Sequence, residues 1–178
     1  MKKNRKSKLH SRRGFTLVEM LCVTLIMVLM CLVLASGLSI ATNAFHSLSF
    51  EAEAQILMDN VNTAISDYVR FAVSPSDDAT GRMTTFANRN TGYNVSETGY
   101  IAGGSNDDGE GRIYLHRSSS DTEGTLLVNE GAYDEMTITD FRMRYDSSTQ
   151  VFSGSYTINS ADMSESKDCT FSFRTIAV

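Results

Sequence analysis

Hydrophobic and polar residues are segregated along the chain, and the first pattern is one long apolar run. Residues 20–41 are apolar side chains diluted only by serine, threonine and glycine, and no Asp, Glu, Lys or Arg occurs between Glu19 and Glu51. The 22 residues of this run, as α-helix, rise about 33 Å, which is enough to cross a hydrocarbon core of about 30 Å. The run therefore predicts a membrane-spanning helix.

The second pattern is an amphipathic helix beyond the apolar run. Its apolar stripe recurs at helical spacing and consists of Leu57, Met58, Val61, Ala64, Ile65, Tyr68, Val69 and Ala72. The opposite side carries Asp59, Asn60, Asn62, Ser66, Asp67 and Arg70. Ser74-Pro75 is expected to stop the helix, because proline lacks a backbone donor and restricts the residue before it. We predict one helix from about Phe15 to Ala72, with its first half in the membrane and its second half packed on a sheet.

The third pattern, from residue 83 onward, is a series of short alternating segments separated by turn residues. It predicts strands near Met83–Ala87, Gly99–Ala102, Arg112–His116, Thr125–Val128, Met136–Tyr145, Gln150–Ile158 and Cys169–Ile176. Residues 145–150 join two alternating runs, so an antiparallel hairpin is expected there. A helix laid across an antiparallel sheet gives an α+β fold.

Charge is distributed as unevenly as hydrophobicity. Residues 1–14 hold seven of the sixteen basic residues and no acid, so this block carries +7, whereas the rest of the chain carries −12. By the positive-inside rule, the N-terminus stays in the cytoplasm and everything after residue 41 is exported. This arrangement disfavours a fully soluble cytosolic enzyme. Residues 51–178 carry twenty acidic against nine basic residues, which disfavours contact with nucleic acid.

Three kinds of export segment begin with a basic region and an apolar stretch. An ordinary secretory signal would be cut after Ala35-Ser36-Gly37. A lipoprotein signal needs small residues before its cysteine, and neither Cys22 nor Cys31 has them. The third kind is indicated by residues 12–19, RRGFTLVE, in which a glycine ends the basic block and one carboxylate, Glu19, enters the apolar helix. A carboxylate in a spanning helix is costly, which implies either a partner for Glu19 or a position near the lipid headgroups, and this residue alone does not decide between the two.

This RRGFTLVE segment, followed by an uninterrupted apolar helix, resembles the N-terminal signature of type IV prepilins and of the pseudopilins of type II secretion. The resemblance covers about residues 12–40. It implies that a prepilin peptidase cuts after Gly14 on the cytoplasmic face and N-methylates Phe15. It also implies that Glu19 pairs with the N-terminal ammonium of a neighbouring subunit during filament assembly. The implied partners are other pilin or pseudopilin subunits and, indirectly, an assembly platform and its ATPase.

The resemblance divides the chain into four parts. These are a basic leader (1–14), a transmembrane and filament-core helix (15–42), the amphipathic second half of the helix (43–75) and an exported β-rich head (76–178). A minor pilin-like subunit is the favoured interpretation, but major versus minor and pilus versus pseudopilus stay open. Many Gram-negative pilins close a C-terminal loop with a disulfide. Here Cys22 and Cys31 fall in the membrane helix, which leaves Cys169 without a partner in the head.

Other candidate sites have little support in the sequence. Asp107, Asp108 and Glu110 lie in a loop with two glycines that suits calcium, but its spacing fails the EF-hand pattern and a solvated acidic loop is favoured. We therefore assign no metal, no cofactor and no catalytic residue. The remaining candidates, for which packing or surface roles are favoured, are His10, His46, His116, the serine run Ser118–Ser120 and the sequon Asn94-Val95-Ser96.

The leading functional hypothesis is a structural subunit of a filament. The alternative is a membrane-anchored extracellular binding module that is not built into a filament.

Overall fold

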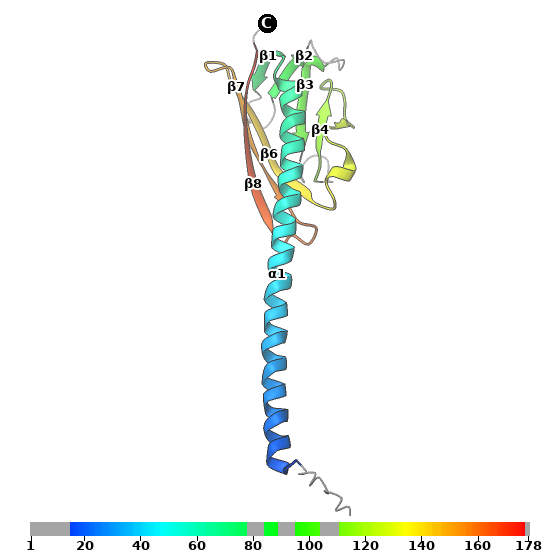
Figure 1. Ribbon diagram of the computed structural model, residues 1–178. Helices are drawn as coiled ribbons and strands as arrows, with labels where there is room; N and C mark the ends of the chain where they lie inside the picture. The colour runs from blue at the N-terminus through cyan, green and yellow to red at the C-terminus, as the bar shows by residue number, and fades with distance from the viewer. Residues whose placement is uncertain (1–14, 78–83, 89–94, 104–110, 177–178) are drawn as a thin grey trace, which may run out of the picture. The chain divides into compact units, whose positions relative to one another are not determined.

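The computed structural model describes residues 15–77, 84–88, 95–103 and 111–176, and the statements below concern those residues. The chain divides into two compact units, residues 1–45 and residues 46–178. Helix α1 (Leu17–Val69) contributes to both units. The predicted α+β class is confirmed, because this apolar helix is followed by antiparallel sheets (Figure 1).

In the second unit, α1 turns a stripe of fully buried side chains toward the sheets. The stripe consists of Ala54, Leu57, Val61, Ile65 and Val69. Their spacing of three and four residues places them on one helical face, as the sequence predicted. Ser66, which we placed on the polar side, is buried at 8% exposure and borders this stripe.

Polar contacts also fix α1 on the three-stranded sheet. At the start of β8 (Ser166–Arg174), Lys167 Nζ lies 2.6 Å from Glu51 Oε1 and donates to Gln55 Oε1 at 3.0 Å. On β7 (Val151–Asn159), the Tyr156 hydroxyl donates to Asn62 Oδ1 at 3.1 Å. The second half of α1 is therefore held by both burial and hydrogen bonds.

The end of α1 differs from the prediction, because the helix stops at Val69 rather than at Ala72. Carbonyl groups in the last turn of a helix lack intrahelical donors. Two other segments supply donors at this end: Asn88 Nδ2 donates to Tyr68 O in the last turn, and Ile176 N donates to Arg70 O, one residue beyond the helix, at 2.8 Å. Both donors come from distant parts of the sequence, so tertiary contacts decide where the helix ends.

Ala72 and Pro75 belong to strand β1 (Ala72–Asp77), which the sequence analysis did not predict. The interpretation of Pro75 as the helix stop was wrong. β1 lies at the edge of its sheet, and its register with β2 (Thr84–Asn88) shifts between Val73 and Ser76. Proline is tolerated on an edge strand or at a bulge because no ladder hydrogen bond is required of its nitrogen.

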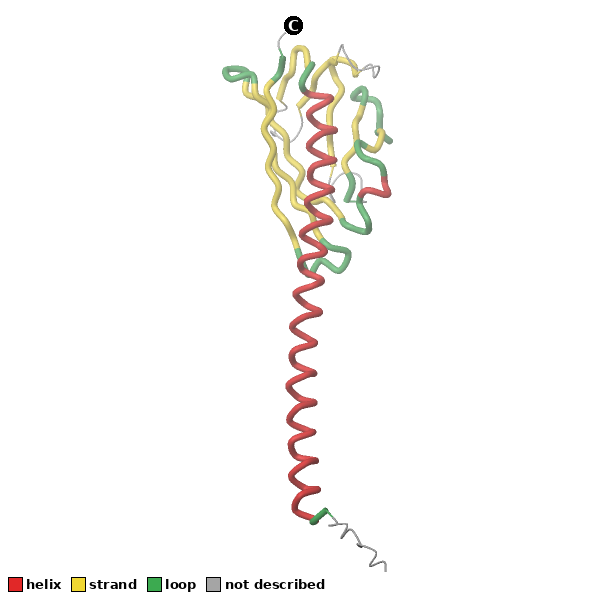
Figure 2. Tube along the Cα trace, in the orientation of Figure 1, coloured by secondary structure: helices red, strands yellow, loops and turns green. Residues whose placement is uncertain are grey.

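The described strands, yellow in Figure 2, form two sheets in which all neighbouring strands pair antiparallel. One has the order β1-β2-β3-β4-β5 and the other the order β6-β7-β8. The bounds not yet given are β3 (Val95–Gly103), β4 (Ile113–His116), β5 (Thr125–Leu126) and β6 (Thr137–Asp146). A short 3-10 helix, Glu130–Ala132, precedes β6. All seven predicted strands are confirmed, with ends that differ by at most four residues, and β6 and β7 form the predicted hairpin.

The core between α1 and the three-stranded sheet contains a group of aromatic rings. The Phe171 ring lies 6.1 Å from the Phe141 ring and 6.3 Å from the Tyr156 ring, between centroids. Gly154 in β7 makes room for it, because a Cβ built there would lie 2.3 Å from Phe171 Cζ and 2.2 Å from Arg142 O. A glycine inside a strand often marks such a close approach.

Replacing Gly154 with alanine is therefore expected to destabilise the second unit. Overpacking of a well-packed core lowers the free energy of unfolding by about 1–3 kcal/mol. Of the two atoms that the added Cβ would meet, Arg142 O belongs to the backbone, which cannot move aside as a flexible side chain can. The measurement is thermal unfolding of the full-length protein in detergent, followed by circular dichroism. Ser153→Ala is the matched control, since Ser153 is the preceding residue and is exposed. Equal melting of the two variants would contradict this account of Gly154.

Candidate processing and assembly site

The first turn of α1 is closed by a reciprocal pair of hydrogen bonds between Thr16 and Glu19. The Glu19 amide donates to Thr16 Oγ1 at 3.2 Å, and the Thr16 amide donates to Glu19 Oε2 at 2.8 Å. The Thr16 hydroxyl also lies 3.0 Å from Glu19 Oε2. Thr16 directly precedes Leu17, the first helical residue, so the pair has the geometry of a capping box.

This arrangement gives Glu19 a partner within its own chain. The resemblance to prepilins implies only an intermolecular role for Glu19, and Thr16 was not among the predicted site residues. The signal was available, since a threonine followed three residues later by a glutamate, just before an apolar run, is the capping-box pattern. Glu19 therefore has two possible functions, closing the helix end and meeting a charge from another chain.

The predicted cleavage position lies immediately ahead of this cap. Gly14 falls outside the described residues, and Phe15 is 76% exposed and precedes the capping residue. A chain that began at Phe15 would have its terminal amine one residue before Thr16. The predicted cleavage position is therefore separated from the capped carboxylate of Glu19 by only a few residues.

The helix that follows presents an apolar surface without a covering partner in its own unit. From Phe15 to Ile40, the large apolar side chains are between 53% and 82% exposed. Among the described residues, α1 is the one helix long and apolar enough to cross a membrane, and its most apolar 18-residue window has a mean hydropathy of 2.8 with none of it buried. Length and composition alone also fit a signal sequence, so the assignment needs the N-terminal motif.

Polar side chains in this segment are satisfied locally. The Thr24 hydroxyl donates to Leu21 O at 2.9 Å, and the Ser36 hydroxyl donates to Val33 O at 2.9 Å. Thr42 does the same toward Leu38 O at 3.1 Å. Such bonds remove the cost of hydroxyl groups in an apolar medium. Glu19 is then the one charged residue between residues 15 and 50.

The other candidates from the sequence do not converge on a site in the described residues. His116 is buried, stacks on Tyr100 with ring centroids 4.4 Å apart, and has Nδ1 2.7 Å from Asp121 O, which is a packing role. Cys169 is buried in β8, whereas Cys22 and Cys31 are exposed on α1. No group of His, Cys, Asp and Glu in the described residues could hold a metal ion. The acidic loop with Asp107, Asp108 and Glu110 lies outside them, as do His10 and Asn94.

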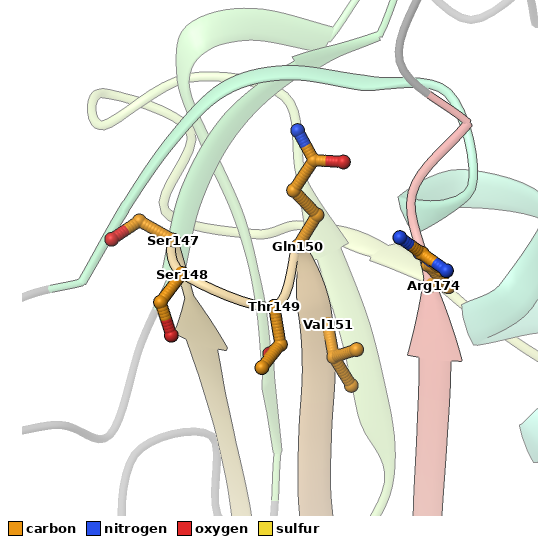
Figure 3. Close-up of a pocket in the computed structure, with 6 residues that line it drawn as sticks. All are labelled: Ser147, Ser148, Thr149, Gln150, Val151 and Arg174. Atoms are coloured by element: carbon orange, nitrogen blue, oxygen red, sulfur yellow. The ribbon is translucent and has the colours of Figure 1, made fainter.

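A polar hollow of about 440 Å³ lies at the turn between β6 and β7, lined by Ser147–Val151 and Arg174. Its labelled side chains point in different directions, with Arg174 on the far side from Ser147 and Ser148 (Figure 3). The turn is organised by Asp146, whose carboxylate accepts from the Ser148 hydroxyl at 2.6 Å and the Thr149 hydroxyl at 2.8 Å. These bonds account for the shape of the turn without a ligand.

The same bonds make the turn sensitive to acid. Hydrogen bonds from the Ser148 and Thr149 side chains and from the Ser148 amide lower the pKa of Asp146 from 3.8 to about 2. A depressed pKa stabilises the folded turn above pH 3.8, and this contribution is lost as the pH falls toward 2. We expect Ser148→Ala to raise the pKa of Asp146 toward 3.8, as measured by carboxyl NMR titration. An unchanged pKa in that variant would contradict the assignment.

Comparison with known proteins identifies the N-terminal segment. A family profile described as the prokaryotic N-terminal methylation motif matches residues 9–35. The match includes Gly14, Phe15, Thr16, Glu19 and the first part of the apolar run. No curated protein and no solved structure matches the chain.

Proposed function

Since its N-terminal methylation motif makes this chain a type IV prepilin-like protein with a membrane-anchoring helix, we propose that it is a structural subunit of a type IV pilus or pseudopilus. In this proposal a prepilin peptidase cuts after Gly14 and N-methylates Phe15. The mature subunit then leaves the membrane for a filament whose core is built from the apolar helices. The motif favours such a structural subunit over an enzyme.

The observation that carries the proposal is the exposed apolar helix with one capped carboxylate at its start. Apolar side chains that are more than half exposed in one chain require lipid or other chains around them. Cleavage removes the +7 block that holds the segment at the cytoplasmic surface. The same helix can then exchange lipid for the helices of neighbouring subunits.

The proposed orientation follows from charge. The basic leader lies in the cytoplasm, where the peptidase, the assembly platform and its ATPase are expected to act. The second unit lies outside the cytoplasmic membrane and reaches the cell surface within the filament. A minor subunit is favoured over a major one.

Glu19 is proposed to serve assembly by pairing with the Phe15 ammonium of a neighbouring subunit. In the single chain the carboxylate is held by Thr16, so its position is fixed before a neighbour arrives. A charge left unpaired in an apolar filament core is strongly unfavourable, so pairing selects one register between helices.

Mass spectrometry of the N-terminus, carried out separately on membranes and on sheared filaments, tests the proposal. Methylated Phe15 in both fractions is the expected result. A terminus at Leu38 would indicate an ordinary secreted protein, and one at Met1 would indicate an uncut membrane protein. Methylated Phe15 in membranes without the subunit in filaments would favour the alternative, a membrane-anchored binding module.

A further inference from the structure

The outward face of the three-stranded sheet is polar, in contrast to its inward face. The inward side chains of β8, Cys169 and Phe171, are buried in the core. Along the middle strand β7, the outward positions carry small hydroxyl side chains, Ser153, Ser155 and Thr157. On the β6 side this row of small side chains lies beside two long ones, because Ser155 is opposite Arg142 and Ser153 is opposite Arg144.

A hollow of about 390 Å³ occupies part of this face. Its lining comes from all three strands, and its side chains belong to two neighbouring rows across the sheet. In the first row Arg142 lies opposite Ser155, and Ser155 lies opposite Thr170. In the second row Thr157 lies opposite Asp168. The polar side chains that line the hollow are those of Asp140, Arg142, Ser155, Thr157, Asp168 and Thr170.

A β-bulge in β6 brings Asp140 into this set. The register between β6 and β7 shifts between Thr139 and Arg142, which gives β6 one extra residue. Ile138 and Phe141 are both buried, so two residues, Thr139 and Asp140, fit between them where a regular strand has one. Asp140 takes a left-handed backbone conformation, with φ of 54°. Bulges re-aim side chains and are frequent beside functional sites.

Most polar groups of the hollow have no partner in the protein. Within the described part of the chain, the side chains of Asp140, Arg142, Ser155 and Thr170 make no hydrogen bond or ion pair. Asp168 is fixed, since its Oδ1 accepts from the Thr157 hydroxyl at 2.8 Å. Asp140 and Arg142 carry opposite charges on one strand and still do not pair with each other. Donors and acceptors are therefore both available to a ligand.

We propose that this hollow binds a neutral saccharide through its hydroxyl groups. Carboxylates accept hydrogen bonds, a guanidinium donates them, and serine and threonine hydroxyls do both, which matches a ligand rich in hydroxyl groups. Two aspartates against one arginine disfavour phosphate and other anionic groups. The lining is more polar than apolar, which disfavours acyl and aromatic ligands, because the sites of such ligands are predominantly apolar. The site does not depend on filament assembly, although repeated copies along a filament would add avidity.

The test uses full-length protein in dodecylphosphocholine, a detergent without a sugar headgroup. Saturation-transfer NMR is recorded with lactose, maltose, mannobiose and N,N′-diacetylchitobiose, and dextran sulfate serves as the anionic probe. We expect binding of at least one disaccharide and none of dextran sulfate. Arg142→Gln and Asp140→Asn should each weaken binding by at least about tenfold, which is the effect of losing a charge-assisted hydrogen bond. Asparagine is chosen at position 140 because it tolerates the positive φ of that residue.

Arg144→Gln is the matched control. Arg144 is exposed on the same strand and the same face, opposite Ser153, but it does not line the hollow. It should bind the disaccharide as the unaltered protein does, and all variants should melt at the same temperature. Should Arg142→Gln have a lower melting temperature than the unaltered protein, Arg142→Met is used in its place, because methionine keeps an unbranched apolar stem but has neither the charge nor a hydrogen-bond donor. Absence of binding to all four disaccharides, an equal loss in Arg144→Gln, or preferential binding of dextran sulfate would overturn the proposal.

Discussion

Gly14→Lys is expected to stop maturation, so that the protein accumulates in the membrane with its N-terminus at Met1. Glycine has no side chain, and the backbone on both sides of the scissile bond can lie extended in a protease cleft without steric cost. A long charged side chain at this position obstructs that approach. The mature form should fall by at least about tenfold, which corresponds to a barrier increase of about 1.4 kcal/mol.

The measurement is the ratio of precursor to mature protein by mass spectrometry of the membrane fraction. Gly14→Ala is the matched control, because one methyl group adds little bulk, and it should keep part of the processing. Ser11→Lys adds the same charge three residues upstream and should be processed normally. Processing of Gly14→Lys at the rate of the unaltered protein would show that the bond after Gly14 is not the one cut.

Periodicity explains how much of the fold could be predicted. Two features are local patterns: the buried stripe of Leu57, Val61 and Ile65 on α1, and the alternation of buried and exposed residues along β8. Each pattern shows which face of a single helix or strand is buried. The end of α1 depends instead on hydrogen bonds from Asn88 and Ile176, which belong to distant segments, and β1 depends on its pairing with β2. Such tertiary hydrogen bonds leave no periodic signal, so the helix was predicted too long and β1 was missed.

The two candidate sites differ in the same way, because one is a local sequence pattern and the other depends on contacts between distant segments. Residues 12–19 are contiguous, so the processing motif could be read directly from the sequence, and the profile match covers the same segment. The saccharide hollow combines residues from three strands, and its key residue Asp140 is placed by a bulge. Neither the register nor the bulge is visible in the sequence pattern, so that hollow could not be predicted.

Glu19→Ala is expected to insert into the membrane and to be cleaved normally, but to be absent from filaments. If α1 were only an anchor, removing a carboxylate from an apolar helix would be neutral or favourable. If helices pack side by side, the change leaves the Phe15 ammonium of a neighbour without its counter-charge in an apolar core. Incorporation should then fall by at least about tenfold, the effect of about 1.4 kcal/mol in the assembly equilibrium.

The capping box makes a sharper experiment possible, because Glu19→Ala removes both the charge and the cap. Glu19→Gln keeps a residue that completes a capping box but has no charge. Thr16→Val removes the hydroxyl that bonds to Glu19 and keeps the charge. If the charge acts in assembly, Glu19→Gln fails to enter filaments as Glu19→Ala does, whereas Thr16→Val is incorporated.

The readout is the amount of each variant in sheared filaments relative to its amount in the membrane. Normal incorporation of Glu19→Gln together with loss of Thr16→Val would assign Glu19 to closing its own helix and would remove it from the contact between subunits. Equal incorporation of all three variants would leave Glu19 without a part in assembly. Since Glu19 is the one charged residue between residues 15 and 50, register between subunits would then have to come from the shapes of the apolar side chains alone.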